Sequence, residues 1–363
     1  MTLNINYLIL ALALASSSTE LFGDTKLGAS FRANYISDEV TIQESGESEK
    51  SHVTSFNLER ARLNLQSDLT NKTSFRLRLR FDKSSDIRGN GQTDAIDLAY
   101  VSHSFTPYIK LTIGKKHARY GGPIGAFKPY ENNGYLHNTV RKLLRRTVGA
   151  TLDYKIAKNH VLTVSYSNRP DVDKLDNDEF SETYSPKSYM SGLVYEGRFG
   201  PIRPSISLFH VPAMKKSYSD DDGVMVRKQE GADNYWGAGA RYQQDGVMVG
   251  LSYLGARFAA DRDLIAGTNS NKETYASIHL NSGYDVSDEF KLRFLVESTA
   301  IQEGDETKDI FAYAPVVEYR PDPDLETLRY FVSMKDKRTK QSTVEEHQLE
   351  FLLGFGLDAT LNL

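Results

Sequence analysis

The sequence contains no cysteine, so no disulfide stabilises this chain of 363 residues. Long apolar runs are missing beyond the first residues, and a mean hydropathy of −0.47 excludes a bundle of transmembrane helices. The eight histidines form no H-E-x-x-H motif, and no serine lies in a G-x-S-x-G motif. The net charge of −4 gives no indication of a nucleic-acid partner. From these absences we expect no enzyme, no catalytic residue, no metal and no cofactor.

One apolar run is present at the N-terminus. Residues 7–15 are apolar but too few to span a bilayer, and small polar residues follow at 16–19. That order is typical of a secretory leader. We expect residues 1–23 to be a signal peptide and residues 24–363 to form a single domain.

The stretch Phe75–Phe81 alternates strictly between apolar residues and arginines. Because the side chains of a β-strand point to opposite faces in turn, Arg76, Arg78 and Arg80 share one face and the apolar residues share the other. The pattern fits a strand of a soluble antiparallel sheet as well as a strand of a membrane barrel. The rest of the chain separates these two interpretations.

Alternating segments follow one another to the C-terminus, and long and short connections alternate between them. The expected strands span 27–35, 52–66, 75–81, 93–104, 107–116, 147–157, 160–168, 187–198, 202–211, 232–244, 246–257, 272–285, 287–300, 309–320, 324–335 and 344–363. Long outer loops, short periplasmic turns and an even strand number are typical of outer-membrane barrels. Many of these segments exceed the ~5–6 residues usual in soluble sheets. The sequence therefore predicts an all-β fold, a transmembrane antiparallel β-barrel of about 16 strands in the bacterial outer membrane.

The end of the chain supports this location. After Gly356, apolar residues occur at Ala359, Leu361 and Leu363, with a spacing of two. The pattern resembles the C-terminal strand signal of bacterial outer-membrane proteins, with leucine at the last position where those proteins usually have phenylalanine or tryptophan.

The arginine strand is expected to face a second row of arginines on the strand before it. Like charges opposed on a sheet need water, anions or carboxylates between them, and Asp97 on the next strand is the candidate carboxylate. Two interpretations stay open, a salt-bridge ladder that stiffens the wall and an electropositive wall that attracts anions. With a turn at about residue 70, the expected facing pairs are Arg60 with Arg80, Arg62 with Arg78, and Asn64 with Arg76.

The alternation also assigns faces to three other charged residues. Strict alternation places Glu59 on the lipid face of the second strand. Either Glu59 lies at the outer interface, where a charge costs little, or a β-bulge shifts the register there. On the fifth strand, Lys110 and Lys116 are expected to point inward.

The connection at 117–146 is strongly basic. It carries six basic residues against one acid, Glu131, which gives a net charge of +5. A surface loop with scattered charge is the alternative to a functional role. The predicted loops 38–51 and 169–186 are acidic instead, which suits a solvated rim or divalent cations shared with lipopolysaccharide. The six basic residues are Arg119, Lys128, Arg141, Lys142, Arg145 and Arg146.

Short motifs within about residues 55–120 resemble one porin family. Residues 56–65, with the sequence FNLERARLNL, and Leu79–Asp82 on the next strand resemble the second hairpin of the phosphate-selective porins O and P. Leu111–Lys116 is similar to the strand that leads into their constriction loop. Residues 117–122 depart from the family pattern.

The resemblance implies a diffusion channel that forms a homotrimer, contacts outer-membrane lipid and lipopolysaccharide, and conducts small anions such as phosphate. It also implies that the third long loop, 117–146, folds inward and narrows the pore. The alternatives are a structural or adhesive barrel whose lumen is plugged by salt bridges and, more remotely, an outer-membrane lipase. The expected pore-lining, anion-binding residues are Arg60, Arg62, Arg76, Arg78, Arg80, Lys110, Lys116, Arg119, Arg141 and Arg145.

Overall fold

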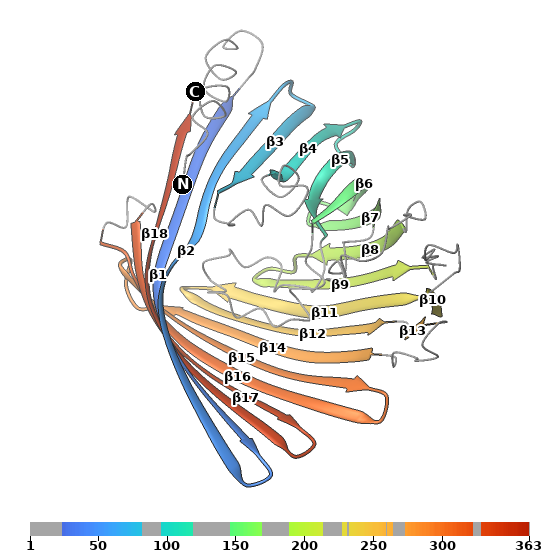
Figure 1. The fold of residues 1–363 in the computed structure, drawn as a ribbon. Helices are drawn as coiled ribbons and strands as arrows, with labels where there is room; N and C mark the ends of the chain where they lie inside the picture. The colour runs from blue at the N-terminus through green and yellow to red at the C-terminus, as the bar shows by residue number, and fades with distance from the viewer. Residues whose placement is uncertain are drawn as a thin grey trace, which may run out of the picture.

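Sixteen strands close into an antiparallel barrel in the computed structural model of the protein (Figure 1). β1 pairs with β18 to complete the ring, from Lys26 opposite Asn362 to Glu44 opposite Val344. The predicted transmembrane β-barrel of about 16 strands is thereby confirmed. The structure describes residues 24–81, 96–118, 146–168, 189–212, 227–230, 232–258, 260–263, 273–321 and 328–362.

Each of the sixteen predicted strands corresponds to one strand of the barrel. Within the described ranges, no helix is long and apolar enough to cross a membrane. The predicted signal peptide at 1–23 lies outside the described residues. The barrel strands are β1 Thr25–Glu44, β2 Glu47–Asp68, β3 Thr73–Arg80, β4 Ile96–Ser104, β5 Ile109–His117, β6 Arg146–Ala157, β7 His160–Asn168, β8 Tyr189–Gly197, β9 Ile202–Val211, β11 Asp233–Gln244, β12 Val247–Phe258, β14 Glu273–Asp285, β15 Phe290–Glu303, β16 Glu306–Tyr319, β17 Leu328–Gln341 and β18 Val344–Asn362. Two short strands, β10 Arg227–Glu230 and β13 Ala260–Asp263, pair with each other in a separate sheet.

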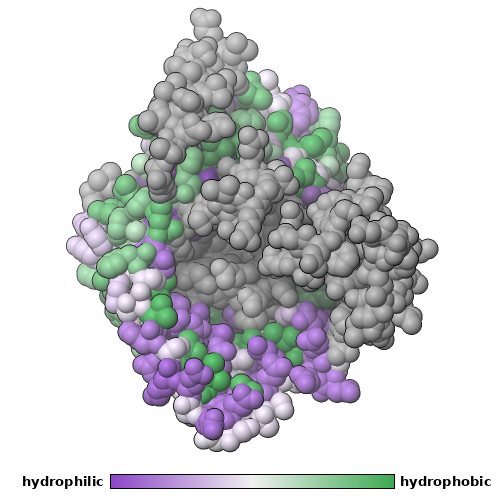
Figure 2. Space-filling view, viewed as in Figure 1, coloured by the Kyte–Doolittle hydropathy of each residue, from purple (hydrophilic) through white to green (hydrophobic). Residues whose placement is uncertain are grey.

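Three long hairpins, β1–β2, β15–β16 and β17–β18, run to tight turns (Figure 1). The loops predicted at 38–51, 301–308 and 336–343 are therefore wrong, because the strands continue through most of each segment to a two-residue turn. Charged residues pair across the extended strands, as Lys340 Nζ does with Glu345 Oε1 at 3.0 Å. These segments have the charged composition of a loop, but they form paired strands that extend into water. Hydrophilic residues gather at this end of the molecule in Figure 2.

Apolar side chains on the outer face of the strands form the lipid-facing band. On β18 the register alternates exposed large residues with the small or buried residues of the inner face, such as Gly354 and Leu352. A band of exposed apolar side chains would be costly on the outer face of a soluble monomeric barrel, whereas lipid covers that face here. The exposed outer residues of β18 are Leu349, Phe351, Leu353, Phe355, Leu357 and Leu361.

Aromatic rings mark both edges of this band. Tyr166 of β7 and Tyr189 of β8 stack with their ring centroids 4.8 Å apart. Both residues lie at the strand ends that are far from the short β6–β7 and β8–β9 turns. Phe290 and Tyr319 stack at 4.8 Å beside the short turn between β14 and β15. Aromatic girdles at both membrane interfaces are characteristic of outer-membrane barrels.

A β-bulge at Glu59 sets the faces of β2. The register passes from Arg32 opposite Arg60 to Ala33 opposite Leu58, so Glu59 is the extra residue of β2. The bulge interpretation is therefore confirmed. Its consequence is that Arg60 stays on the inner face, while the apolar residues after the bulge turn outward.

The lipid-facing band predicts a depth-dependent cost for charge. Leu251 lies in the middle of β12 and its side chain is 55% exposed on the outer face. Leu251→Arg should lower the free energy of unfolding from lipid vesicles by about 2–4 kcal/mol, since the guanidinium must sit in hydrocarbon. Leu251→Ala, the matched control, should cost about 1 kcal/mol. Equal effects of the two substitutions, measured by urea unfolding, would contradict this assignment of the outer face.

Candidate functional site

The candidate site is the arginine cluster, which we define as Arg60, Arg62, Arg76, Arg78 and Arg80 on the inner faces of β2 and β3. The register places Arg62 opposite Arg80, with Asn64 opposite Arg78 and Gln66 opposite Arg76. The predicted pairing of these residues is therefore wrong by two positions, although every side chain keeps its predicted face because a shift of two preserves the alternation. Arg60 lies opposite Arg32 of β1 instead.

The turn between β2 and β3 explains the shift in register. The Thr70 hydroxyl oxygen accepts hydrogen bonds from the backbone N–H of Lys72 at 3.1 Å and of Thr73 at 3.0 Å. Thr70 and Thr73 also exchange two backbone hydrogen bonds. These contacts move the centre of the turn one residue towards the C-terminus from the predicted position, and each facing pair moves by two.

Asp97 is the carboxylate partner of the cluster, as predicted. It is completely buried and forms an ion pair with Arg78, while Arg62 Nε and Arg80 Nη1 each lie 3.9 Å from its carboxylate oxygens. A register shift between Arg78 and Leu79 brings this segment of β4 beside the arginines. Three guanidinium groups thus surround the carboxylate of Asp97.

Two neutral side chains orient the guanidinium groups. Arg76 Nε donates to Asn64 Oδ1 at 2.9 Å, and Arg78 Nη2 lies 2.8 Å from His117 Nε2 at the end of β5. Sequence reasoning did not assign a role to His117, because its position at the edge of a predicted loop gave no indication of its direction. Buried arginines need such fixed partners to hold their planar groups in one orientation.

Arg32 is a second residue that the sequence analysis missed. It is 2% exposed, faces Arg60 directly, and places its guanidinium carbon 4.3 Å from the centroid of the Phe331 ring. The cation–π contact with Phe331 accommodates a buried charge beside the cluster. Alternation in the first strand could have identified it, because Arg32 lies two residues from the inward-facing Asn34.

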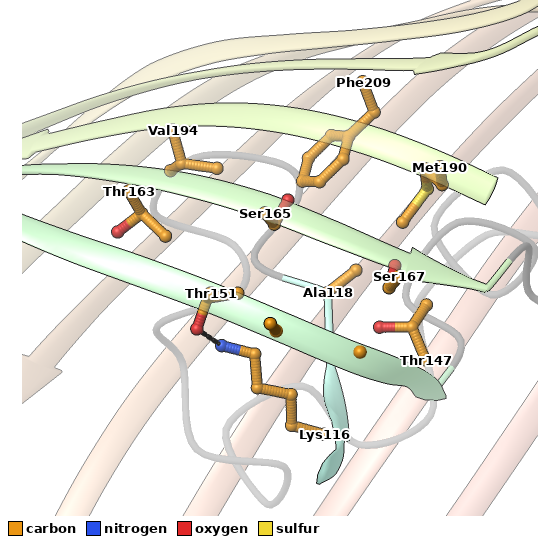
Figure 3. A pocket seen from close by; sticks show the side chains of 12 residues that line it. Lys116, Ala118, Thr147, Thr151, Thr163, Ser165, Ser167, Met190, Val194 and Phe209 are labelled. Atoms are coloured by element: carbon orange, nitrogen blue, oxygen red, sulfur yellow. Dashed lines mark hydrogen bonds between the residues drawn. The ribbon is translucent and has the colours of Figure 1, made fainter. Parts of the chain in front are cut away.

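The two lysines predicted to line the pore lie apart from each other. Lys116 donates from Nζ to the Thr151 hydroxyl of β6, beside a small cavity (Figure 3). Lys110 lies opposite Asp153 in a recess at the short-turn end of the barrel, where Lys155 and Glu196 also line the wall. Arg119, Arg141 and Arg145 lie outside the described residues.

The chain leaves β5 towards the inside of the barrel. Gly114 adopts a φ of 131°, a backbone conformation that suits glycine, and β5 stays paired with β6 as far as His117. Ala118 is 8% exposed and packs in a cluster with Met190 and Phe209, which lie on the inner faces of β8 and β9 (Figure 3). Since β6 and β7 separate β5 from β8 in the wall, Ala118 reaches these residues from the lumen side.

The lumen wall facing the arginine cluster has a different character. The barrel order places β8–β14 opposite β2–β4. That wall presents buried apolar side chains, and the ion pairs found among the described residues of β14–β18 are close to balanced. Lys337, for example, pairs with Glu346 at 3.4 Å, and Lys335 pairs with Glu350 at 4.0 Å. The unbalanced positive charge among these residues is therefore greatest on β2 and β3.

Comparisons with known proteins agree with this geometry. The sequence model of the family phosphate-selective porin O and P matches residues 32–123, which include the whole arginine cluster and Asp97. Residues 32–123 thus resemble the phosphate-selective porins O and P. The whole barrel has the fold of bacterial outer-membrane porins.

Solved structures similar to this porin share its fold at low sequence identity. The anion-selective porin from Comamonas acidovorans is 12% identical, with a TM-score of 0.51 over 92% of this chain and 100% of that chain. The outer-membrane expressed OmpT of Vibrio cholerae is 12% identical, with a TM-score of 0.56 over 94% and 99% of the two chains. Pseudomonas putida OprB is 11% identical, with a TM-score of 0.53 over 92% and 94%. None of the curated proteins matches the chain.

The shared carboxylate predicts a stability effect that distinguishes Asp97 from other acids of the lumen. Asp97→Asn should lower the free energy of unfolding by about 3 kcal/mol, since it removes a buried carboxylate that three guanidinium groups share. Asp285→Asn, the control, removes a carboxylate that is 35% exposed and should cost below about 1 kcal/mol. Denaturant unfolding of both variants measures the difference, and equal losses would show that Asp97 is no more important than an exposed acid.

Proposed function

We propose that this porin is a diffusion channel for small hydrophilic solutes with a bias to anions such as phosphate. The observation that supports the bias most directly is the arginine cluster, in which Arg62, Arg78 and Arg80 share the single carboxylate of Asp97. The matched family is described as phosphate-selective, and one similar structure is described as an anion-selective porin.

The physical basis of the bias is fixed positive charge in a narrow aqueous space. Low-dielectric walls concentrate the field of the arginines in the lumen, which raises the local concentration of anions and lowers that of cations. Arginine keeps its charge at every physiological pH, and its planar group can donate two parallel hydrogen bonds to an oxyanion. Lumen side chains of such barrels tune selectivity without contributing to the lipid-facing surface.

We also propose that the protein works as a homotrimer in contact with outer-membrane lipid and lipopolysaccharide. The trimer rests on the family resemblance, and the lipid contact rests on the apolar outer band. The third long loop, at 117–146, is proposed to fold into the lumen and narrow it. The position of Ala118 against the inner faces of β8 and β9 supports this direction for the start of the loop.

The two alternatives account for less of the geometry. A lumen plugged by salt bridges would pair each base with its own carboxylate, whereas Arg62, Arg78 and Arg80 all approach the carboxylate of Asp97. Measurable conductance in planar bilayers separates a channel from a plugged barrel, which would give none.

An outer-membrane lipase would need an accessible nucleophile, and we propose that the protein is not an enzyme. Ser277 Oγ lies 2.8 Å from His279 Nε2, and His279 Nδ1 lies 3.8 Å from Glu297. Thr299, however, donates its hydroxyl to Glu297 at 3.0 Å and lies 2.5 Å from Ser277 Oγ. Ser277 must therefore donate its own hydrogen to Thr299 and not to the imidazole, and its side chain is completely buried.

The arginine cluster predicts a change in selectivity when its charge is removed. Replacing Arg76, Arg78 and Arg80 with serine should lower the anion-to-cation permeability ratio by roughly fivefold, since three charges leave the same strand face. The control replaces Lys50, Arg338 and Lys340, whose side chains are 69%, 68% and 66% exposed. Reversal potentials in a salt gradient measure both. A thermal stability loss with an unchanged reversal potential in the cluster variant would favour a structural role.

The proposed direction of the third loop predicts a site-specific block. Because the natural chain has no cysteine, a single Arg141→Cys variant can be labelled at that position alone. A small charged thiol reagent should react there and reduce the conductance by narrowing the lumen. Ser45→Cys, at the turn between β1 and β2, should react without changing the current. Labelling at position 141 with no change in current would place the loop outside the lumen.

A further inference from the structure

His117 contacts the arginine cluster from a different strand. It is the last residue of β5, whereas Arg78 lies on β3, with β4 between them in the barrel order. His117 Nε2 nevertheless lies 2.8 Å from Arg78 Nη2, and the next residue, Ala118, packs against Met190 and Phe209 on the lumen side. The imidazole is therefore a lumen group within the anion-attracting wall and is not part of the lipid face.

The chemistry of the two groups fixes the direction of this hydrogen bond. A guanidinium group has only donors, so Arg78 must donate and His117 Nε2 must accept. Only a neutral imidazole with its proton on Nδ1 can accept at Nε2. Protonation of His117 would replace the acceptor with a second N–H donor and would place two positive charges 2.8 Å apart. The contact and the protonated form of His117 are therefore incompatible.

The charged groups on the strands near His117 come from five elements. β3 contributes Arg76, Arg78 and Arg80, β2 contributes Arg60 and Arg62, and β4 contributes Asp97. On β5 itself, Lys115 and Lys116 precede it, and Arg146 of β6 is its register partner. Among these described groups the bases outnumber the carboxylate of Asp97, so a protonated His117 would add a further positive charge to this part of the wall.

We propose that His117 is a positioning residue for Arg78 and that its protonation makes the anion bias of the pore depend on pH. This inference rests on the proposed anion bias. In the neutral state, His117 accepts a hydrogen bond from Arg78 Nη2 and so orients the guanidinium group towards the end of β5. In the protonated state, the contact is lost, Arg78 is left to its ion pair with Asp97, and the lumen wall carries one more positive charge.

The sign and size of the effect follow from this change in charge. The cluster and Asp97 together carry five positive charges and one negative charge, and protonation of His117 adds one more positive charge to that excess. The measurement compares pH about 8 with pH about 5.5, a range in which imidazole groups can change charge while most carboxylates stay ionised. An added unit charge at about 10 Å, partly screened by salt, should raise the anion-to-cation permeability ratio by roughly twofold.

The test is the reversal potential of the full-length porin in a potassium chloride gradient at both pH values. The natural protein should show the twofold increase, whereas His117→Gln should keep the ratio of the natural protein at high pH throughout. Glutamine retains a neutral acceptor, so it preserves the contact with Arg78 but does not titrate. His279→Gln is the matched control, since His279 is also on an inner face but contacts Ser277 and Glu297 on the opposite wall. This control should retain the full pH response.

The outcomes separate this inference from the proposed function. An anion-selective natural protein whose ratio is unchanged between the two pH values would overturn the role of His117. The same follows if His117→Gln responds to pH as the natural protein does, or if His279→Gln loses the response instead. A natural protein without anion preference at either pH would contradict the proposed function itself.

Discussion

The fold depends on one constraint, which is that every backbone N–H and C=O inside hydrocarbon must find a partner in the protein. Strands meet this requirement only when the sheet has no edge, and the pairing of β1 with β18 removes the two edges that would otherwise remain. The same closure fixes the two faces of each strand, so lipid receives the apolar set and the lumen receives the polar set. The position of every lumen group follows from this alternation.

The lumen that results has two unlike walls. On β2 and β3, alternation brings five arginines to the inner face, and the bulge at Glu59 keeps Arg60 among them. Asp97 offsets part of their charge and lies against the guanidinium groups of Arg62, Arg78 and Arg80. In the proposed function, structure and selectivity depend on the same contacts, because the residues that stabilise this wall are also the ones that attract anions.

Much of this arrangement was predictable from the sequence because a period of two is unambiguous over long segments. The strands, the inward face of the arginines and the partnership of Asp97 all follow from it. The register of β2 and β3 was not predictable, since it depends on how the Thr70 hydroxyl organises one turn. The extended hairpins were mistaken for loops because charge and strand structure are compatible in water. His117 was missed because it lies at the edge of the predicted loop 117–146, where the pattern gave no indication of the direction of its side chain.

The measurement that tests the central claim most directly is the reversal potential of the natural protein in a planar bilayer with a salt gradient across it. The account predicts open channels with a potential of the sign set by faster anion movement, and a reduction of chloride current when phosphate is added. A potential of the opposite sign, set by faster cation movement, would contradict the account. In that case the excess positive charge of the arginine cluster would not control the ions that pass.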